Sequence, residues 1–289
     1  MDVPAAFFGR TTLDVLYALD VLPAEDTKVF AQGFRAAPGG PACNAAIAHT
    51  LLGGGATLFT ALGGGPWAGA VRDELHRRKI NLVDLAAGTA YEAPLTTVIL
   101  NRTRATRTIV NPPQVHLEMP LLDRGWKAEW GESPRIILLD GFHVREALPL
   151  LRTIHGNSTP LVLDGGSWKP GTDVLTPLLT AAICSERFAV PGSSADPEST
   201  LQWFASQGVP HAAVTRGPLP ILALDRGRRF EIEIPPIEAI DTSGAGDVLH
   251  GAFCYHYGKS RNFEQALRAA AEVATRSCCT LGIDGWKEN

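Results

Sequence analysis

The segment Gly244-Ala245-Gly246-Asp247 combines an anion-binding turn with a carboxylate beside it. Small residues ahead of a helix leave successive backbone N–H groups unshielded, and the helix dipole adds to their attraction for anions. An aspartate repels an anion held there, so its presence points to metal binding or to accepting a proton from a hydroxyl that attacks phosphorus. The alternative is that the glycines form a tight turn and Asp247 caps the helix. The local pattern leaves both interpretations open.

A second cluster, Pro38-Gly39-Gly40-Pro41-Ala42-Cys43-Asn44, also precedes a helical segment. Glycines let a ligand approach the backbone, and the Asn44 amide can donate and accept hydrogen bonds together, as recognition of a polyol requires. An ordinary turn followed by an N-cap asparagine fits this cluster equally well. The cluster alone therefore does not decide between a ligand site and a structural turn.

Strand-like and helix-like segments alternate along most of the chain. Apolar runs bounded by turn residues predict buried strands at 5–8, 57–62, 136–139, 161–163, 182–184 and 212–215. Helical spacing between them predicts helices at 44–52, 68–79, 144–155 and 197–207. Such alternation is typical of a parallel sheet covered by helices on both faces. Asp140 and Asp164 each end an apolar run and precede a glycine, which predicts positions at the carboxyl edge of the sheet, where open α/β folds bind ligands.

The C-terminal third shows a hairpin followed by two helices. Strands are expected at 221–224 and 230–234, then a helix over 248–257 that Gly258 ends, and a last helix that begins at Asn262 with Gln265 as its capping partner. Two regions elsewhere, 14–36 and 93–110, have extended strands with no helix between them, which predicts a small accessory sheet. We therefore expect a single domain over 1–289, with accessory strands near 13–37 and 93–112.

Composition narrows the classes of function. The chain has 289 residues, of which 45% are hydrophobic and 19% charged, so it can bury a sizeable core. Its formal net charge of -4 argues against a protein that binds nucleic-acid backbones, which would show a strongly basic patch. Five cysteines, an odd number without a C-x-x-C pair, fit neither a disulfide framework nor a zinc site. We expect a reducing, cytoplasmic location.

A long uncharged stretch runs from Pro38 to Val71. It is long enough to span a bilayer, but its glycines and prolines divide it into pieces too short to cross hydrocarbon as one helix. The N-terminal residues offer no basic start, apolar core and cleavage site of a signal peptide. We therefore expect no membrane association.

Three elements together are far more specific than each alone. Asp14, the Gly39-Gly40 pair with Asn44, and the run from Asp241 to Asp247, in this order and separation, resemble the PfkB carbohydrate-kinase family, also called ribokinase-like. The resemblance covers nearly the whole chain, and residues 262–286 are similar to ketohexokinase-like members in particular. It implies a three-layer α/β/α sandwich with a mostly parallel central sheet and a small β-sheet lid. It also implies an ATP-dependent kinase acting on a small sugar, with a ketohexose such as fructose as the expected acceptor.

The resemblance implies a role for each matching position. Asp247 matches the catalytic base, and Gly244, Ala245 and Gly246 match the anion hole for the transferred γ-phosphoryl group. The positions that match substrate-binding residues are Asp14, Asp26, Gly39, Gly40, Asn44, Asp140 and, from the lid, Arg107. The positions that match the nucleotide site are Thr215, Gly217, Gly244, Gly246, Cys279 and Gly282.

The resemblance also implies ATP as co-substrate, with Mg²⁺. The family's N-x-x-E motif, which is tied to Mg²⁺ and phosphate, is missing, and the nearest segment makes Glu186 the candidate metal ligand. In some members the positions matching Asp241 and Ser243 bind a monovalent cation, so K⁺ is a further candidate. Pro41 stands where many sugar-binding members have asparagine, and this departure leaves the identity of the sugar open.

Two other functions remain open from the sequence. One is a nucleoside kinase, or a kinase of another polyol, within the same family. The other is a catalytically impaired protein that binds sugar or nucleotide and regulates a partner, as Pro41 and the missing N-x-x-E motif suggest. In each case the partners are small molecules, and a homodimer formed through the lid sheet is the expected assembly.

Overall fold

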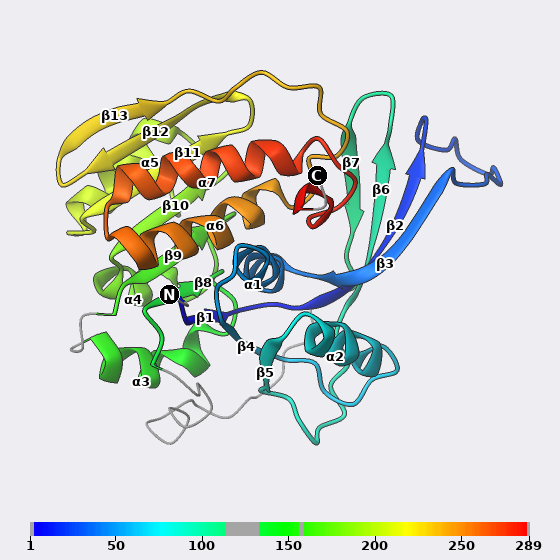
Figure 1. Cartoon of the computed structure of the whole chain (residues 1–289), viewed down its shortest axis with the longest axis horizontal. Coiled ribbons are helices and arrows are strands. Elements are labelled where there is room, and N and C mark those ends of the chain that lie inside the picture. The colour runs from blue at the N-terminus through cyan, green and yellow to red at the C-terminus, as the bar shows by residue number, and fades with distance from the viewer. Residues whose placement is uncertain (1–2, 114–132, 156–158, 288–289) are drawn as a thin grey trace.

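The computed structural model describes residues 3–113, 133–155 and 159–287, and their strands form two sheets (Figure 1). In these residues the larger sheet has nine strands in the order β13-β12-β11-β10-β9-β8-β1-β4-β5. The strands from β11 to β5 in this order are parallel, and β12 and β13 add an antiparallel hairpin. Their bounds are β1 Ala5–Phe8, β4 Ala56–Thr60, β5 Ile80–Asp84, β8 Ile136–Leu139, β9 Leu161–Gly165, β10 Ala181–Ser185, β11 His211–Arg216, β12 Leu219–Asp225 and β13 Arg228–Ile232.

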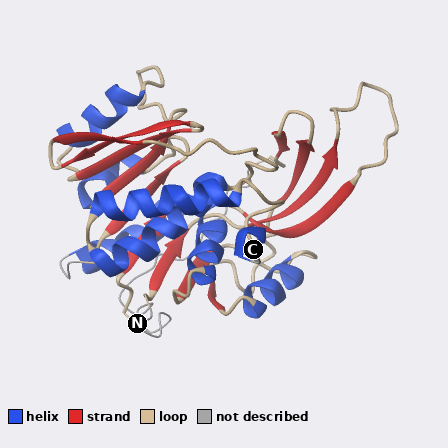
Figure 2. Ribbon diagram, turned by 45° about the horizontal axis from the view of Figure 1, so that its top comes forward, coloured by secondary structure: helices blue, strands red, loops and turns tan. Residues whose placement is uncertain are grey.

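Helices cover both faces of this sheet, as Figure 2 shows. Side chains alternate across a strand, so Phe7 packs into one core and Phe8 into the other. The Phe7 core contains α1 (Pro41–Leu51), α2 (Ala68–Arg77), α6 (Ala245–Ser260) and α7 (Phe263–Ser277). The Phe8 core contains α3 (Val144–His155), α4 (Thr172–Leu175) and α5 (Pro197–Ser206). This arrangement confirms the predicted three-layer sandwich.

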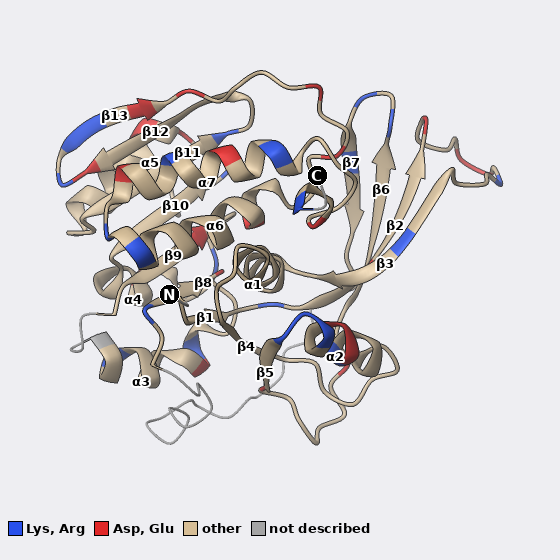
Figure 3. Cartoon of the chain, in the orientation of Figure 1, with Lys and Arg blue, Asp and Glu red and all other residues tan. Residues whose placement is uncertain are grey.

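Much of the uncharged stretch from Pro38 to Val71 is buried in this sandwich. It includes α1 and β4, which carry no charged side chain (Figure 3). Residues from Ala42 to His49 are buried in α1, and α6 approaches so closely that a Cβ on Gly251 would lie 2.2 Å from the carbonyl oxygen of Ala45. Small residues thus allow α1 and α6 to pack backbone against backbone. Within the described residues, no helix has the length and apolar character needed to cross a membrane.

The smaller sheet forms the lid and projects from one end of the larger one (Figures 1 and 2). Its strands are β2 (Thr12–Leu19), β3 (Gly33–Gly39), β6 (Leu95–Asn101) and β7 (Thr106–Val110), in the order β3-β2-β6-β7. The register aligns Ala37, Asp14 and Thr96 in one row across the sheet. A second row aligns Arg35, Leu16, Val98 and Ile109. Residues of a row share a face of the sheet, so these two rows form one surface.

Ion pairs join the lid to the rest of the molecule. Asp284, in the C-terminal segment, accepts hydrogen bonds at 2.8 and 2.9 Å from Arg35 of the lid and at 2.7 Å from Arg78, which follows α2. Arg78 also donates to Glu74 at 2.6 Å. Burial disfavours the charged form of Asp284, but the two arginines hold the pKa of its carboxyl below the usual value. This network fixes one edge of the lid against α2 and the C-terminal segment.

Two details of the predicted elements were wrong. Strand β5 was not predicted, because Asn81 and Asp84 interrupt its apolar run at the edge of the sheet. Helix α6 was expected to end at Gly258, whereas it continues to Ser260 and ends where Arg261 takes a φ of 57°. Gly258 is needed for space, since a Cβ there would lie 2.5 Å from Cγ1 of Val3.

Candidate active site

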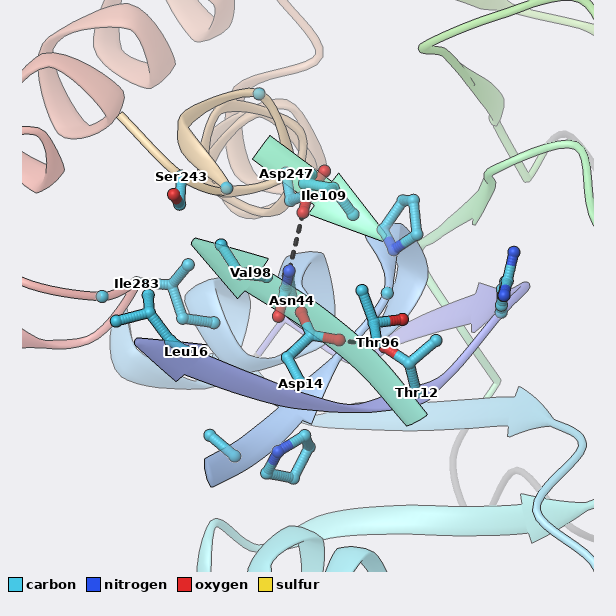
Figure 4. A pocket seen from close by; sticks show the side chains of 18 of the residues that line it. Thr12, Asp14, Leu16, Asn44, Thr96, Val98, Ile109, Ser243, Asp247 and Ile283 are labelled. Carbon is cyan, nitrogen blue, oxygen red and sulfur yellow. Dashed lines mark hydrogen bonds between the residues drawn. The ribbon is translucent and has the colours of Figure 1, made fainter. Parts of the chain in front are cut away.

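A cavity of about 450 Å³ lies between the lid and the carboxyl edge of the larger sheet. This volume is in the usual range for small-molecule sites. Figure 4 shows polar side chains from several elements pointing into it, among them Asp14 from β2, Asn44 from α1 and Asp247 from α6. Both rows of the lid surface contribute to its lining. The cavity therefore joins the sequence motifs from the two ends of the chain.

Asp14 is held in the cavity by two neighbours. The Thr12 hydroxyl donates a hydrogen bond to its carboxylate at 2.5 Å. The carboxyl group also packs directly on Gly39 of β3, where a Cβ would lie 2.1 Å from Asp14 Cγ. Burial raises the pKa of the Asp14 carboxyl, while Thr12 and the positive charge of Arg10 oppose that shift. Gly39 thus acts by leaving room for Asp14, not by lining the cavity.

Asp247 lies in the first turn of α6, which Gly244 begins in a left-handed conformation with φ 73°. The Asn44 amide donates to its carboxylate at 2.7 Å. Backbone N–H groups in the first turn of a helix have no partner within the helix, so the Gly244–Gly246 turn can bind an anion beside Asp247. Burial raises the pKa of the Asp247 carboxyl to about 7, and the negative charge of Asp164 adds to this shift. Asn44, together with His250 and Arg107, opposes it.

Asp140 lies below the cavity and is absent from its lining. Its carboxylate is fully buried and accepts hydrogen bonds from the backbone N–H groups of Arg10 at 2.9 Å, Ala42 at 3.2 Å and Phe142 at 2.9 Å. Burial raises the pKa of this carboxyl to about 6. These bonds join the loops after β1 and β8 to the first turn of α1, and the expected contact of Asp140 with substrate stays a prediction.

The loop ahead of α6 connects the lid with the C-terminal segment. The Asp241 carboxylate accepts from the N–H groups of Ser243 at 2.8 Å and Gly282 at 3.0 Å. From β7 of the lid, Arg107 donates to the carbonyl and hydroxyl oxygens of Thr242 at 3.2 and 3.3 Å. The lid is thus attached directly to the loop that carries the proposed anion hole.

The predicted site residues separate into two groups. Those that line the cavity are Asp14, Gly40, Asn44, Arg107, Asp241, Ser243, Gly244, Gly246, Asp247 and Gly282. Those outside its lining are Asp26, Gly39, Asp140, Glu186, Thr215, Gly217, Ala245 and Cys279. Asp26 is exposed in the loop between β2 and β3, because these strands carry that loop to the far end of the lid, and Glu186 is exposed after β10.

Several lining residues were missed from the sequence. Thr12 could have been found from strand alternation, since it lies two residues from Asp14 in β2. Thr96 could not, because only the pairing of β2 with β6 places it beside Asp14. Arg10 and Lys169 also line the cavity, with their charged groups 5.4 and 4.9 Å from the centre of the Phe142 ring. Lys169 follows the Asp164-Gly165-Gly166-Ser167-Trp168 segment, which stands where the family has a D-x-N-x-R element, whereas no local pattern marks Arg10.

Comparison with known proteins identifies the family. A family model described as pfkB family carbohydrate kinase matches residues 5–285. The chain belongs to the pfkB family of carbohydrate kinases. This kinase is 21% identical to the ribokinase of Bacillus subtilis over 278 residues, covering 96% of this chain and 93% of the relative. It is 23% identical to the ketohexokinase of Mus musculus over 298 residues, covering 96% of each.

A solved structure shows the same fold. Arabidopsis thaliana ribokinase, complexed with ribose and ATP, matches with a TM-score of 0.77 at 18% identity, covering 98% of this chain and 94% of that one. The pfkB kinase is thus a phosphotransferase that uses an alcohol group as acceptor. The family prediction made from Asp14, Asn44 and the 241–247 run is confirmed.

The raised pKa of Asp247 predicts a pH dependence for this kinase. If Asp247 must accept a proton, the enzyme is inactive while that carboxyl is protonated, so kcat/KM for the acceptor should rise with pH through about 7 and then level off. Initial rates from pH 5 to 9 at saturating nucleotide measure this rising part, or acid limb, of the pH–rate profile. The residual activity of Asp247→Asn should show no such acid limb. A kcat/KM that is already level from pH 5 upward would contradict the assignment.

Proposed function

We propose that this kinase transfers the γ-phosphoryl group of ATP to a hydroxymethyl group of a small sugar, a ketohexose such as fructose. The observation that carries the proposal is the position of Asp247, which Asn44 holds at 2.7 Å in the cavity that Asp14 also enters. A carboxylate next to a helix N-terminus places a proton acceptor beside an anion site. In-line phosphoryl transfer requires this combination of alignment and charge stabilisation.

Each group has a distinct part in the proposed reaction. Asp247 accepts the proton of the attacking hydroxyl, and the backbone N–H groups of Gly244, Ala245 and Gly246 stabilise the charge on the transferred group. Asp14, Asn44, the backbone at Gly40 and Arg107 orient the sugar. Because Arg107 comes from the lid, closure of the lid over the sugar would complete the site and exclude water, which would otherwise hydrolyse ATP.

The ATP site is proposed along the same edge of the sheet. Thr215 is the last residue but one of β11, and Gly217 makes the turn into β12 with φ 60°. Cys279 and Gly282 follow α7, and Gly282 reaches the cavity and bonds Asp241. Mg²⁺ would accompany ATP and neutralise its phosphates. The described residues contain no cluster of three metal-binding side chains, and Glu186 is exposed and outside the cavity lining, so we derive no step through a protein-bound Mg²⁺.

Pro41 supports a restricted choice of sugar. It occupies the first turn of α1 and lines the cavity with an apolar ring that has no N–H to donate. A hydroxyl placed against this ring would lose hydrogen bonds to water and gain none in return. The ketohexose proposal itself relies on the similarity to ketohexokinase and not on a distance within the cavity.

The assignment of Asp247 is tested with Asp247→Asn, which keeps the shape but removes the base. We expect kcat to fall by roughly 10²–10⁴-fold, because this is the usual contribution of a general base. Sugar-dependent release of ADP is measured with fructose, other ketoses, ribose and purine nucleosides. Asp173→Asn, at an exposed position of α4, is the matched control and should retain full activity.

The acceptor panel separates the remaining candidates. Turnover with a nucleoside but with no free sugar would replace the proposal with a nucleoside kinase. Tight binding of sugar or nucleotide without a phosphorylated product would indicate a regulatory binding protein. Near-normal turnover by folded Asp247→Asn would overturn the catalytic assignment.

We also propose that K⁺ activates the enzyme at Asp241 and Ser243. Asp241 is 2% exposed, and the buried Ser243 hydroxyl oxygen has no hydrogen-bond partner within the described residues. Carboxylate and hydroxyl oxygens suit a hard cation. The rate should be higher in potassium chloride than in choline chloride at equal ionic strength, and Asp241→Asn should remove this difference. Equal rates for the wild-type enzyme in both salts would refute the site.

A homodimer through the lid is the proposed assembly. The outer face of the lid exposes Tyr17 and Phe34 at 40% and 65%, and Phe30 in the nearby loop is 83% exposed. The Tyr17 and Phe34 rings lie 5.3 Å apart, so they form a contiguous apolar surface that a second copy could bury. Sedimentation at micromolar concentration should give a dimer for the wild-type protein and a monomer for Phe34→Glu. A wild-type monomer would contradict this assembly.

A further inference from the structure

His250 lies one turn after Asp247 in α6 and is buried, with 5% of its surface exposed. Its Nδ1 atom is 2.7 Å from the carbonyl oxygen of Gly246, and its Nε2 atom is 3.0 Å from the carbonyl oxygen of Ile183 in β10. Both ring nitrogens therefore have a hydrogen-bond acceptor within bonding distance.

These two contacts favour a particular number of protons on the His250 ring. A backbone carbonyl accepts hydrogen bonds but cannot donate them, so each ring nitrogen must supply its own hydrogen. A neutral imidazole has one N–H, and its second nitrogen would direct a lone pair at a carbonyl oxygen. The doubly protonated imidazolium satisfies both contacts. The geometry thus favours a positively charged His250.

A buried negative charge lies next to this ring. Asp164 Oδ2 is 3.4 Å from His250 Nδ1, and both side chains are 6% exposed. Asp164 Oδ1 accepts from the N–H of Gly166 at 3.1 Å, but Oδ2 has no hydrogen bond within the described residues. An ionised carboxylate is costly to bury unless a charge compensates it. His250 is the cation within ion-pair distance of Asp164 in the described part of the chain.

The pair also acts on Asp247. The negative charge of Asp164 raises the pKa of the Asp247 carboxyl, whereas His250 lowers it. Asn44 from α1 and Arg107 from β7 act in the same direction as His250. The other titratable groups that sense Asp164 are Asp140, Cys184 and Cys254, and Lys169 opposes Asp164 at the first two of these.

We propose that His250 is a positioning residue that carries both ring protons, keeps buried Asp164 ionised and shields Asp247 from the charge of Asp164. The effect on the reaction rests on the proposed role of Asp247 as base. The charge of the ring itself does not, because it follows from the two carbonyl contacts and the neighbouring carboxylate.

Two neutral substitutions test the shielding through opposite effects. In His250→Asn, Asp164 and Asp247 lose their shared cation, so the acid limb of kcat/KM should move up by about 1 pH unit. In Asp164→Asn, the cation faces Asp247 alone and the limb should move down by a similar amount. The double variant should return the limb towards the wild-type position. Shifts in the same direction, or rate losses without any shift, would overturn the proposal.

A second measurement uses the wild-type protein alone and does not depend on activity. Nitrogen NMR of wild-type protein labelled in its histidines should show one buried ring with both nitrogens protonated. A neutral His250 ring in the wild-type protein would overturn the proposal even if the enzyme is a sugar kinase. A charged ring together with fully active Asp247→Asn would instead reject the proposed base and leave the ion pair intact.

Discussion

Two loops at the carboxyl edge of the sheet and the first turn of α1 donate backbone N–H groups to the buried carboxylate of Asp140. One loop follows β1 and the other follows β8. The remainder of the site depends on this junction, because Arg10, Asn44 and Phe142, which line the cavity, lie on these three segments. Gly9 makes the junction possible, since a Cβ there would lie 2.1 Å from Asp140 Cγ. A carboxylate with three donors compensates part of the cost of its burial.

The cavity is built around carboxylates that are partly or fully removed from water. Burial raises the pKa values of Asp14, Asp140 and Asp247, so this region of the protein stores electrostatic free energy. Such shifts are typical of sites that carry out acid–base chemistry, although structural carboxylates also show them. Geometry separates the two cases here. Asp140 bonds the backbone on all sides, whereas Asp14 and Asp247 reach the cavity.

The lid is joined to the larger part of the molecule by polar contacts that reach from both of its edge strands. Arg35 in β3 bonds Asp284, and Arg107 in β7 bonds Thr242. Both contacts are partly exposed ion pairs or hydrogen bonds, whose net contribution is about 0.5–2 kcal/mol each. Interactions of this size can break and re-form during a catalytic cycle. The same contacts that complete the cavity therefore allow the lid to move.

The local sequence was enough to predict most of the alternating strands and helices. The apolar runs became buried strands, and the helical spacing of apolar residues correctly predicted α3 and α5. The family was identified from three separated elements together, namely Asp14, the Gly39-Gly40 pair with Asn44, and the run from Asp241 to Asp247, because each alone left other interpretations open. Strand alternation would have added Thr12, which lies two residues from Asp14 in β2. The strands and helices, like Thr12, depend on neighbours within a few positions along the chain.

Only the tertiary structure decided which carboxylates face the cavity and which support it. Asp140 and Asp164 each follow an apolar run and precede a glycine in the sequence. In the structure, Asp140 accepts hydrogen bonds from two loops and the first turn of α1, whereas Asp164 pairs with His250. The partners of His250 come from β9, β10 and its own helix, and Asn44 meets Asp247 across 203 positions of sequence. The charge and role of a buried polar group are set by the atoms around it, and packing brings those atoms from distant parts of the chain.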